Sequence, residues 1–147
     1  MGYPEKLLKG LANKEYVIDG CVVDSAFSSS AFKDSLRHES FEESSVNWLD
    51  DEGAIEEALN KKKDKDGSIQ FKAGIAVINR RKLHYVLNAH IIEGRFKYER
   101  DPTEENKYHG NLLLKKGLEK QLRRLIINGI CHSINKGDII PPLTSNG

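Results

Sequence analysis

Alternation of apolar and polar side chains dominates the middle of the chain. It is clearest in three runs, residues 69–79, 95–101 and 107–114. Such alternation is typical of β-strands that bury one face. Pro102 follows the second run with its φ angle already suited to a turn, so we expect residues 95–114 to form a β-hairpin with a loop of five or six residues.

Other segments carry weaker patterns. Residues 15–24 and 45–49 are rich in β-branched and aromatic side chains and are predicted to be strands. Residues 83–94 suit either a strand or a helix, and we favour a strand that follows an exposed turn at residues 80–82. Residues 4–12 are expected to form a short helical piece at best, because a glycine interrupts them.

Helical spacing takes over in the last third of the chain. Apolar residues recur there every three or four positions, which predicts a helix over residues 114–134 that Gly137 ends. A shorter helix is predicted near residues 51–63, since its acidic residues come first and its lysines last, as the helix dipole favours. The serine-rich residues 25–45 are expected to form a long, partly ordered loop, and residues 64–68 an Asp-Gly turn.

These elements together predict an α+β fold. We expect an antiparallel sheet of about five strands packed against a long C-terminal helix, with the shorter helix near residues 51–63. The length of 147 residues fits one domain, which we place at residues 1–137. Residues 138–147 are expected to be a tail, because Pro141 and Pro142 keep it from being helical.

Charged residues are frequent but nearly balanced. The 23 lysines and arginines and the 22 aspartates and glutamates leave a formal charge of +1, which argues against a surface devoted to nucleic acid. The outer face of the predicted C-terminal helix is still basic, and it is either a solvated surface or a contact for nucleic-acid phosphates. Its basic residues are Lys115, Lys116, Lys120, Arg123 and Arg124.

Two features bear on the cellular setting. No apolar run approaches the ~20 residues of a membrane span, and the first residues are too polar for a signal peptide. We therefore expect no membrane partner and a cytoplasmic location. Cys21 and Cys131 lie in apolar surroundings and are expected to be buried thiols, although a disulfide between them stays open.

The predicted hairpin carries the most suggestive polar residues. His109 is a candidate acid or base because imidazole titrates near neutral pH, and Asp101 or Glu99 is a candidate to orient it. On a strand, Asn111 shares the face of His109, while Asn106 flanks the loop. The alternative is a solvated histidine in a charged hairpin whose aspartate and asparagine serve the turn.

A second group lies just before that hairpin. If residues 83–94 form a strand, His84 and His90 share one face, and Arg80, Arg81 and His109 could lie on the same side of the sheet. Arg80 or Arg81 would then be the anion clamp. No H-x-H, HExxH or CxxC spacing is present, so no metal site is predicted. No glycine-rich phosphate loop is present either, and no cofactor is expected.

Two short segments resemble a known pattern. "SVNWL" at residues 45–49 and "DPTEENKYH" at 101–109 are similar to a family of small bacterial proteins in which Ser-Val-x-Trp/Tyr-Leu precedes Asp-Pro-x-x-Glu-Asn-Pro-x-His by several dozen residues. Lys107 stands where the pattern has its second proline. The resemblance carries no activity with it, but it groups Asn47, Trp48, Asp101, Asn106 and His109.

The sequence leaves three functions open. The first is a small bacterial interaction protein, a subunit or adaptor that binds a protein partner or a second copy of itself, with Trp48 in the core or at the interface. The second is a hydrolase acting on a nucleotide or nucleic acid, with His109 as acid or base. The third is nucleic-acid binding without chemistry.

Overall fold

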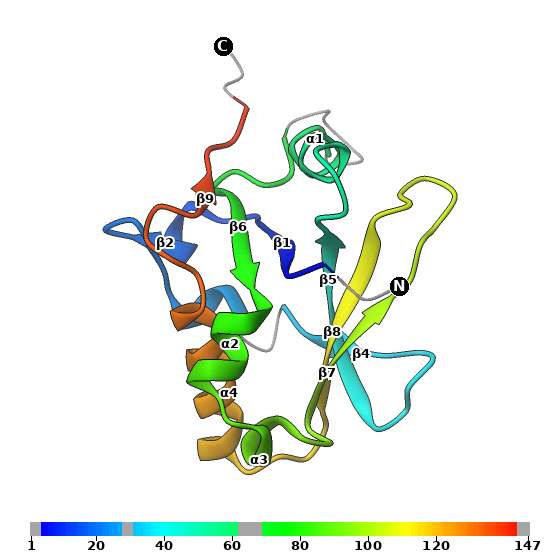
Figure 1. The fold of residues 1–147 in the computed structure, drawn as a ribbon, viewed down its shortest axis with the longest axis vertical. Helices are drawn as coiled ribbons and strands as arrows, with labels where there is room; N and C mark the ends of the chain where they lie inside the picture. The colour runs from blue at the N-terminus through cyan, green and yellow to red at the C-terminus, as the bar shows by residue number, and fades with distance from the viewer. Residues whose placement is uncertain (1–3, 28–30, 62–68, 144–147) are drawn as a thin grey trace.

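The computed structural model describes residues 4–27, 31–61 and 69–143. It confirms an α+β fold with an antiparallel sheet and a C-terminal helix (Figure 1). Within the described ranges the main sheet has seven strands in the order β7-β8-β5-β1-β6-β9, with β4 also beside β5. Its strands are β1 (Lys6–Leu11), β4 (Lys33–Asp34), β5 (Phe41–Trp48), β6 (Gly74–Asn79), β7 (Phe96–Arg100), β8 (His109–Lys115) and β9 (Ile139–Ile140).

Four α-helices and some smaller elements complete the described part of the chain. A separate two-stranded hairpin turns at Asp19 and Gly20, whose φ angles of 53° and 78° lie in the left-handed region. The remaining elements are η1 (Lys14–Tyr16), β2 (Val17–Ile18), β3 (Cys21–Val22), η2 (Asp24–Phe27), α1 (Gly53–Leu59), α2 (Arg80–Val86), α3 (Ala89–Ile92) and α4 (Lys120–His132).

The main hydrophobic core fills the space between one face of the sheet and helices α2, α3 and α4. Figure 1 shows α2 and α4 together at the lower left, to one side of strands β5, β7 and β8. Trp48 of β5 and Leu112 of β8 are fully buried there, together with Ile126 and Ile130 of α4. The three- and four-residue spacing of α4 thus buries one side of the helix, as its pattern predicts.

The opposite face of the sheet is covered only in part, by α1. Leu8 of β1 and Ile75 of β6 pack there against Ala54 and Ala58 of α1, with the ring of Tyr108 beside them. Strands β5, β8 and β7 carry mostly polar side chains on this same face. We call it the α1 face, and the candidate site lies on it.

One edge of β5 is left incompletely paired. Strand β1 pairs with β5 only through Leu7↔Trp48 and Leu8↔Asn47, while β4 pairs further back along β5, at residues 42–43. Residues 44–46 therefore have no strand partner on this edge among the described residues. The ammonium of Lys9 enters this gap and donates to the Ser45 carbonyl at 3.0 Å and to Ser44 Oγ at 2.6 Å.

Two of the predicted elements are wrong in type. Residues 4–12 contain β1 and not a helix, because their leucines serve both faces of the central sheet. Residues 83–94 form most of α2 and all of α3 and not a strand, and residues 80–82 are the first turn of α2 and not an exposed turn. Asn79 and Asn88 explain the difference, because each side chain accepts a backbone N–H as an N-cap.

The C-terminal helix is real but shorter than predicted. Strand β8 continues to Lys115, and Gly117 turns the chain with a φ of 76°, so α4 begins at Lys120 and ends at His132. Its Gly129 permits close packing on α2, since a Cβ there would lie 2.5 Å from Leu87 Cγ.

The other sequence predictions have mixed outcomes. The β7–β8 hairpin is confirmed, with Glu99 opposite Asn111, but its loop spans residues 101–108 and is longer than the five or six residues expected. Strand β5 extends beyond residues 45–49 and takes in part of the serine-rich stretch that we expected to be a loop. Residues 28–30 of that stretch, residues 62–63 of the shorter helix and the turn at 64–68 lie outside the described residues.

Three further findings concern the chain as a whole. Ile139 and Ile140, in the segment expected to be a tail, form β9 and pair with β6. Cys21 and Cys131 are both free, so they form no disulfide, and Cys21 is exposed where burial was expected. In the described ranges, no helix has the length and apolar character needed to cross a bilayer.

Candidate functional site

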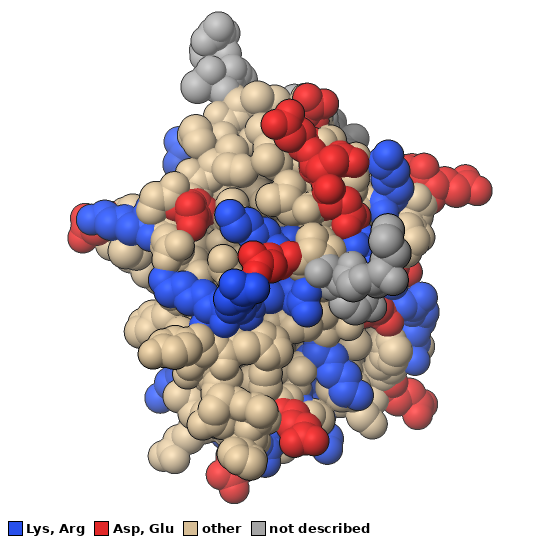
Figure 2. All heavy atoms as spheres, viewed as in Figure 1, with Lys and Arg blue, Asp and Glu red and all other residues tan. Residues whose placement is uncertain are grey.

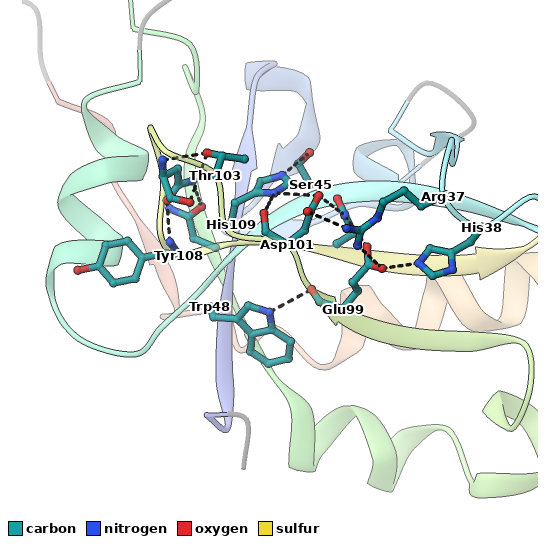
Figure 3. A network of polar contacts seen from close by, with 12 residues as sticks. Arg37, His38, Ser45, Trp48, Glu99, Asp101, Thr103, Tyr108 and His109 are labelled. Carbon is teal, nitrogen blue, oxygen red and sulfur yellow. Dashed lines mark hydrogen bonds and ion pairs between the residues drawn. The ribbon is translucent and has the colours of Figure 1, made fainter. Parts of the chain in front are cut away.

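The α1 face brings a serine, a histidine and an aspartate into line. Ser45 comes from β5, His109 from the start of β8, and Asp101 from the loop that follows β7 (Figure 3). His109 Nε2 lies 3.3 Å from Ser45 Oγ, and its Nδ1 lies 2.8 Å from the Asp101 carbonyl oxygen and 3.6 Å from Asp101 Oδ2. The imidazole therefore connects a hydroxyl on one side with an aspartate on the other.

The contacts of His109 determine which nitrogen carries the proton in the neutral ring. A carbonyl oxygen can only accept, so Nδ1 donates to Asp101. Nε2 is then the acceptor and faces the Ser45 hydroxyl, which is exposed to solvent. This tautomer is the one in which a histidine can take a proton from a nucleophile.

Asp101 and Glu99 form a carboxylate cluster together with the side chains that bind them. Arg37 bridges the carboxylates of Glu99 at 2.6 Å and Asp101 at 3.2 Å, and His38 also binds Glu99 (Figure 3). Asn111 donates to Glu99 at 2.9 Å and contacts Asp101 at 3.4 Å. Partial burial alone would raise the pKa of the Glu99 carboxyl, but hydrogen bonds from Asn111, His38 and Arg37 together lower it.

Two buried asparagines attach the hairpin loop to α1. Asn106 donates to Asn47 Oδ1 at 2.8 Å, and Asn47 donates in turn to the Ala54 carbonyl at 3.1 Å and to Glu57 Oε2 at 2.8 Å. Asn106 also accepts from the Tyr108 backbone N–H at 3.0 Å. Because these amides hold the loop between Asp101 and His109, they position the histidine without facing solvent themselves.

Trp48 belongs to the other side of the sheet. Its ring is completely buried in the main core, but its Nε1 donates to the Glu99 carbonyl at 3.2 Å. Four of the five residues that the resemblance grouped, Asn47, Asp101, Asn106 and His109, therefore meet on the α1 face, while Trp48 supports the strand beneath them.

Two adjoining cavities reach this centre. The smaller one, of about 40 Å³, is lined by His109, Asn47, Asn106 and Glu57 among others. The larger one, of about 400 Å³, opens at the gap between β1 and β4 and contains Lys9. Both are lined by Gly10, Ser45, Lys61 and Phe71.

The predicted histidine–arginine group does not join this centre. His84 stacks on the Tyr98 ring, and its Nε2 forms a hydrogen bond of 3.1 Å with the Tyr98 hydroxyl. Both side chains lie on the main-core face, where Arg80 also lies over the Tyr98 ring. Arg81 is paired with Glu5, and His90 is exposed on α3. The expected convergence with His109 is wrong, because residues 83–94 are helical and lie across the sheet from β8.

The predicted basic face is interrupted by acidic partners. Lys116 lies 3.4 Å from Asp34, and Arg123 is paired with Glu42 at 2.5 Å. Lys115 ends β8, whereas Lys120 and Arg124 lie on α4. Figure 2 shows basic and acidic side chains interleaved over the face in view, with acidic ones gathered over α1.

Several residues of the site were not identified from the sequence. Lys9, Arg37 and His38 come from segments read as helix or loop, and Ser45 stands where the predicted loop meets a short predicted strand, so no strand register was available to bring them to His109. The one sequence signal for Ser45 was its place at the start of "SVNWL". Within the described ranges, no group of three or more His, Cys, Asp or Glu residues is arranged to hold a metal ion.

Comparisons of this chain with protein-family models, with curated proteins and with solved structures found no match.

Proposed function

We propose that this protein is a hydrolase acting on a nucleotide or nucleic acid, with His109 as acid and base and Ser45 as nucleophile. The observation that carries the proposal is the placement of His109 Nε2 at 3.3 Å from the exposed Ser45 hydroxyl, while Nδ1 is held by Asp101. A hydroxyl is a weak nucleophile until an adjacent base accepts its proton. The arrangement supplies that base together with the group that orients it.

The reaction would proceed in two balanced steps. Ser45 Oγ bonds to the phosphorus of the ester as its proton moves to His109 Nε2, and the leaving oxygen departs with that proton. Water then attacks the phosphoserine, gives one proton to His109, and the proton returns to Ser45 Oγ as the phosphate leaves. Asp101 stabilises the imidazolium formed in each step.

The gap in the sheet supports a phosphate as the reacting group. Lys9 places its ammonium against the Ser45 carbonyl and Ser44 Oγ, which brings positive charge to the backbone of the residue that carries the proposed nucleophile. Charge developing on a transferred phosphoryl group is stabilised by such fixed cations. Arg80 and Arg81, the clamp expected from the sequence, lie on the other side of the sheet and take no part.

The test is turnover of a panel of mononucleotides and short RNA and DNA oligonucleotides, followed by anion-exchange chromatography. His109→Asn and Ser45→Ala should each lower turnover by about 10³-fold, since the groups of a relay act as a unit. His84→Asn is the matched control, because that histidine contacts Tyr98 on the opposite face. No turnover by the wild type, or equal loss in all three variants, would contradict the proposal.

A second candidate function is a bacterial, cytoplasmic interaction protein. The observation that favours it is the exposure of large apolar side chains on packed helices: Tyr85 of α2 is 90% exposed and Leu125 of α4 is 46% exposed. Exposed aromatic residues are frequent anchors of interfaces. The two free cysteines are in keeping with a reducing compartment.

Light scattering over a concentration series tests self-association, with Tyr85→Ser as the variant and His109→Asn as the control. A mass that rises with concentration and returns to the monomer in Tyr85→Ser would support an interface there. A strict monomer that retains no partner from lysate would count against this candidate. Non-catalytic nucleic-acid binding would instead show as affinity that falls steeply with salt and is lost in Lys120→Gln with Arg124→Gln.

A further inference from the structure

Three lysines line the larger cavity. Lys9, Lys33 and Lys61 all line it, and none of them forms an ion pair with the described residues. Glu43 also lines the cavity and stands opposite Lys33 in the β4–β5 ladder, so the described lining residues carry three positive charges and one negative. A cavity with this excess of fixed positive charge favours an anionic ligand.

Lys9 is the best placed of the three. Burial, and then the nearby charge of Lys33, lower its pKa from 10.5 to about 8. Its ammonium has two fixed acceptors, Ser44 Oγ and the Ser45 carbonyl, which leaves a third N–H for a ligand. An anion in the cavity would offset both the burial and the repulsion by Lys33.

The rest of the lining suits a flat ring. Phe71 lies directly over Gly10, where an added Cβ would be 2.3 Å from the ring, so the lack of a side chain at Gly10 is what seats the phenyl group. Tyr16 and Gln70 line the same space. Aromatic side chains stack on bases of any kind, and an amide can bond to a base edge.

We propose that this cavity binds a nucleoside monophosphate, with its phosphate among Lys9, Lys33 and Lys61 and its base against Phe71 and Tyr16. The volume of about 400 Å³ lies in the range of small-molecule sites and excludes a folded polynucleotide. The phosphate would then lie beside Ser45, which lines both cavities. The inference narrows the substrate class of the proposed hydrolase to nucleoside monophosphates. It rests on the proposed function only for the claim that the bound phosphate is the group that reacts.

Calorimetric titration of the His109→Asn protein with AMP, adenosine and inorganic phosphate tests the binding. AMP should bind, and adenosine should bind at least tenfold more weakly because it lacks the phosphate. Lys9→Met and Lys33→Gln should each weaken AMP binding about tenfold, whereas Lys120→Gln, on exposed α4 surface, should leave it unchanged. Lys9→Met removes a half-buried charge, and Lys33→Gln changes an exposed side chain. Both variants should therefore remain folded.

The pH dependence gives a second readout. Because the pKa of Lys9 is about 8 in the free protein, AMP binding at pH 8.5 should take up a proton in wild type and none in Lys9→Met, seen as a binding heat that depends on the buffer. Equal affinity for AMP and adenosine, or an unchanged affinity in both lysine variants, would overturn the inference. AMP bound as expected without turnover by the wild type would instead reject the hydrolase and leave the binding site standing.

Discussion

The two faces of the sheet are built on opposite principles. On the main-core face, Trp48, Leu112 and Leu114 are completely covered by helices. On the α1 face, strands β5, β8 and β7 present Ser45, His109 and Glu99, and the short helix α1 packs over β1, β6 and the end of β5. Each strand thus contributes to the core with one set of side chains and to the candidate site with the alternate set.

This division explains why the polar network can stay rigid although it is open to water. The hydrophobic face fixes the backbone of β5, β7 and β8, so side chains one residue away inherit a defined position. The link runs through Trp48, whose ring is in the core and whose Nε1 holds the Glu99 carbonyl. Substitutions on the two faces should therefore separate stability from activity.

The largest effect is expected from Trp48→Ala. The substitution removes a fully buried ring and the hydrogen bond to Glu99, so the free energy of unfolding should fall by about 3–5 kcal/mol. Urea denaturation followed by circular dichroism measures it. Ser45→Ala, on the other face and exposed, should change stability by less than about 0.5 kcal/mol. Similar losses in both variants would mean that the faces do not have separate roles.

The sequence predicted the hairpin and the C-terminal helix because their periodicity is set by burial on one face only. Residues 83–94 were misassigned for the opposite reason, since their apolar positions fit either period and the deciding signals were the Asn79 and Asn88 caps. Residues 4–12 failed because β1 is central and buries leucines on both faces, which removes the alternation.

The site was predictable only where it is local in sequence. Asp101, Asn106, Asn111 and His109 belong to one hairpin, and its register places them together. Ser45 and Lys9 lie 64 and 100 residues before His109, and they reach the site through strand pairings that no local pattern encodes. The gap in the β5 edge, which admits Lys9, follows from where β1 and β4 stop and is a property of the assembled sheet.

Asn47→Ala should produce the second largest effect and tests how the α1 face is held. The change leaves Asn106 without its buried acceptor and removes two bonds to α1, so the free energy of unfolding should fall by about 1–3 kcal/mol. Activity or ligand binding should fall too, because the loop that carries Asp101 loses its anchor. The control is Asn60→Ala, whose side chain donates to the Glu56 carbonyl at the exposed end of α1 and to no other described residue. Equal behaviour of the two variants would refute the anchoring role.

Lys9→Met should raise the free energy of unfolding, and the size of this effect should depend on pH. The unfolded lysine keeps its proton up to about pH 10.5, while the folded one releases it near 8, so the free energy of unfolding of the wild type rises with pH between those values. At pH 7 we expect Lys9→Met to be more stable than wild type by about 1 kcal/mol, which is less than the full pKa shift would give because the side chain is half-buried and solvent screens its charge. The difference should vanish by about pH 10.5. Parallel stability curves over this range would show that Lys9 is not destabilised by its surroundings.

Arg37→Gln should have the smallest effect on stability. It tests whether the bond from Arg37 to Glu99 determines how the fold responds to acid. Arg37 is half exposed, so solvent screens its ion pairs and their loss should change the free energy of unfolding little near neutral pH. The pKa of Glu99 is lowered in the folded protein, so its contribution is present at neutral pH and is lost as pH falls through the folded value. With one hydrogen bond fewer, that loss should begin at a higher pH in Arg37→Gln. Acid denaturation curves measure the shift, and Arg81→Gln, which removes an exposed pair with Glu5 far from the cluster, should show none. A shift of the same size in both variants would mean that general charge, and not the bond to Glu99, sets the acid limit of the fold.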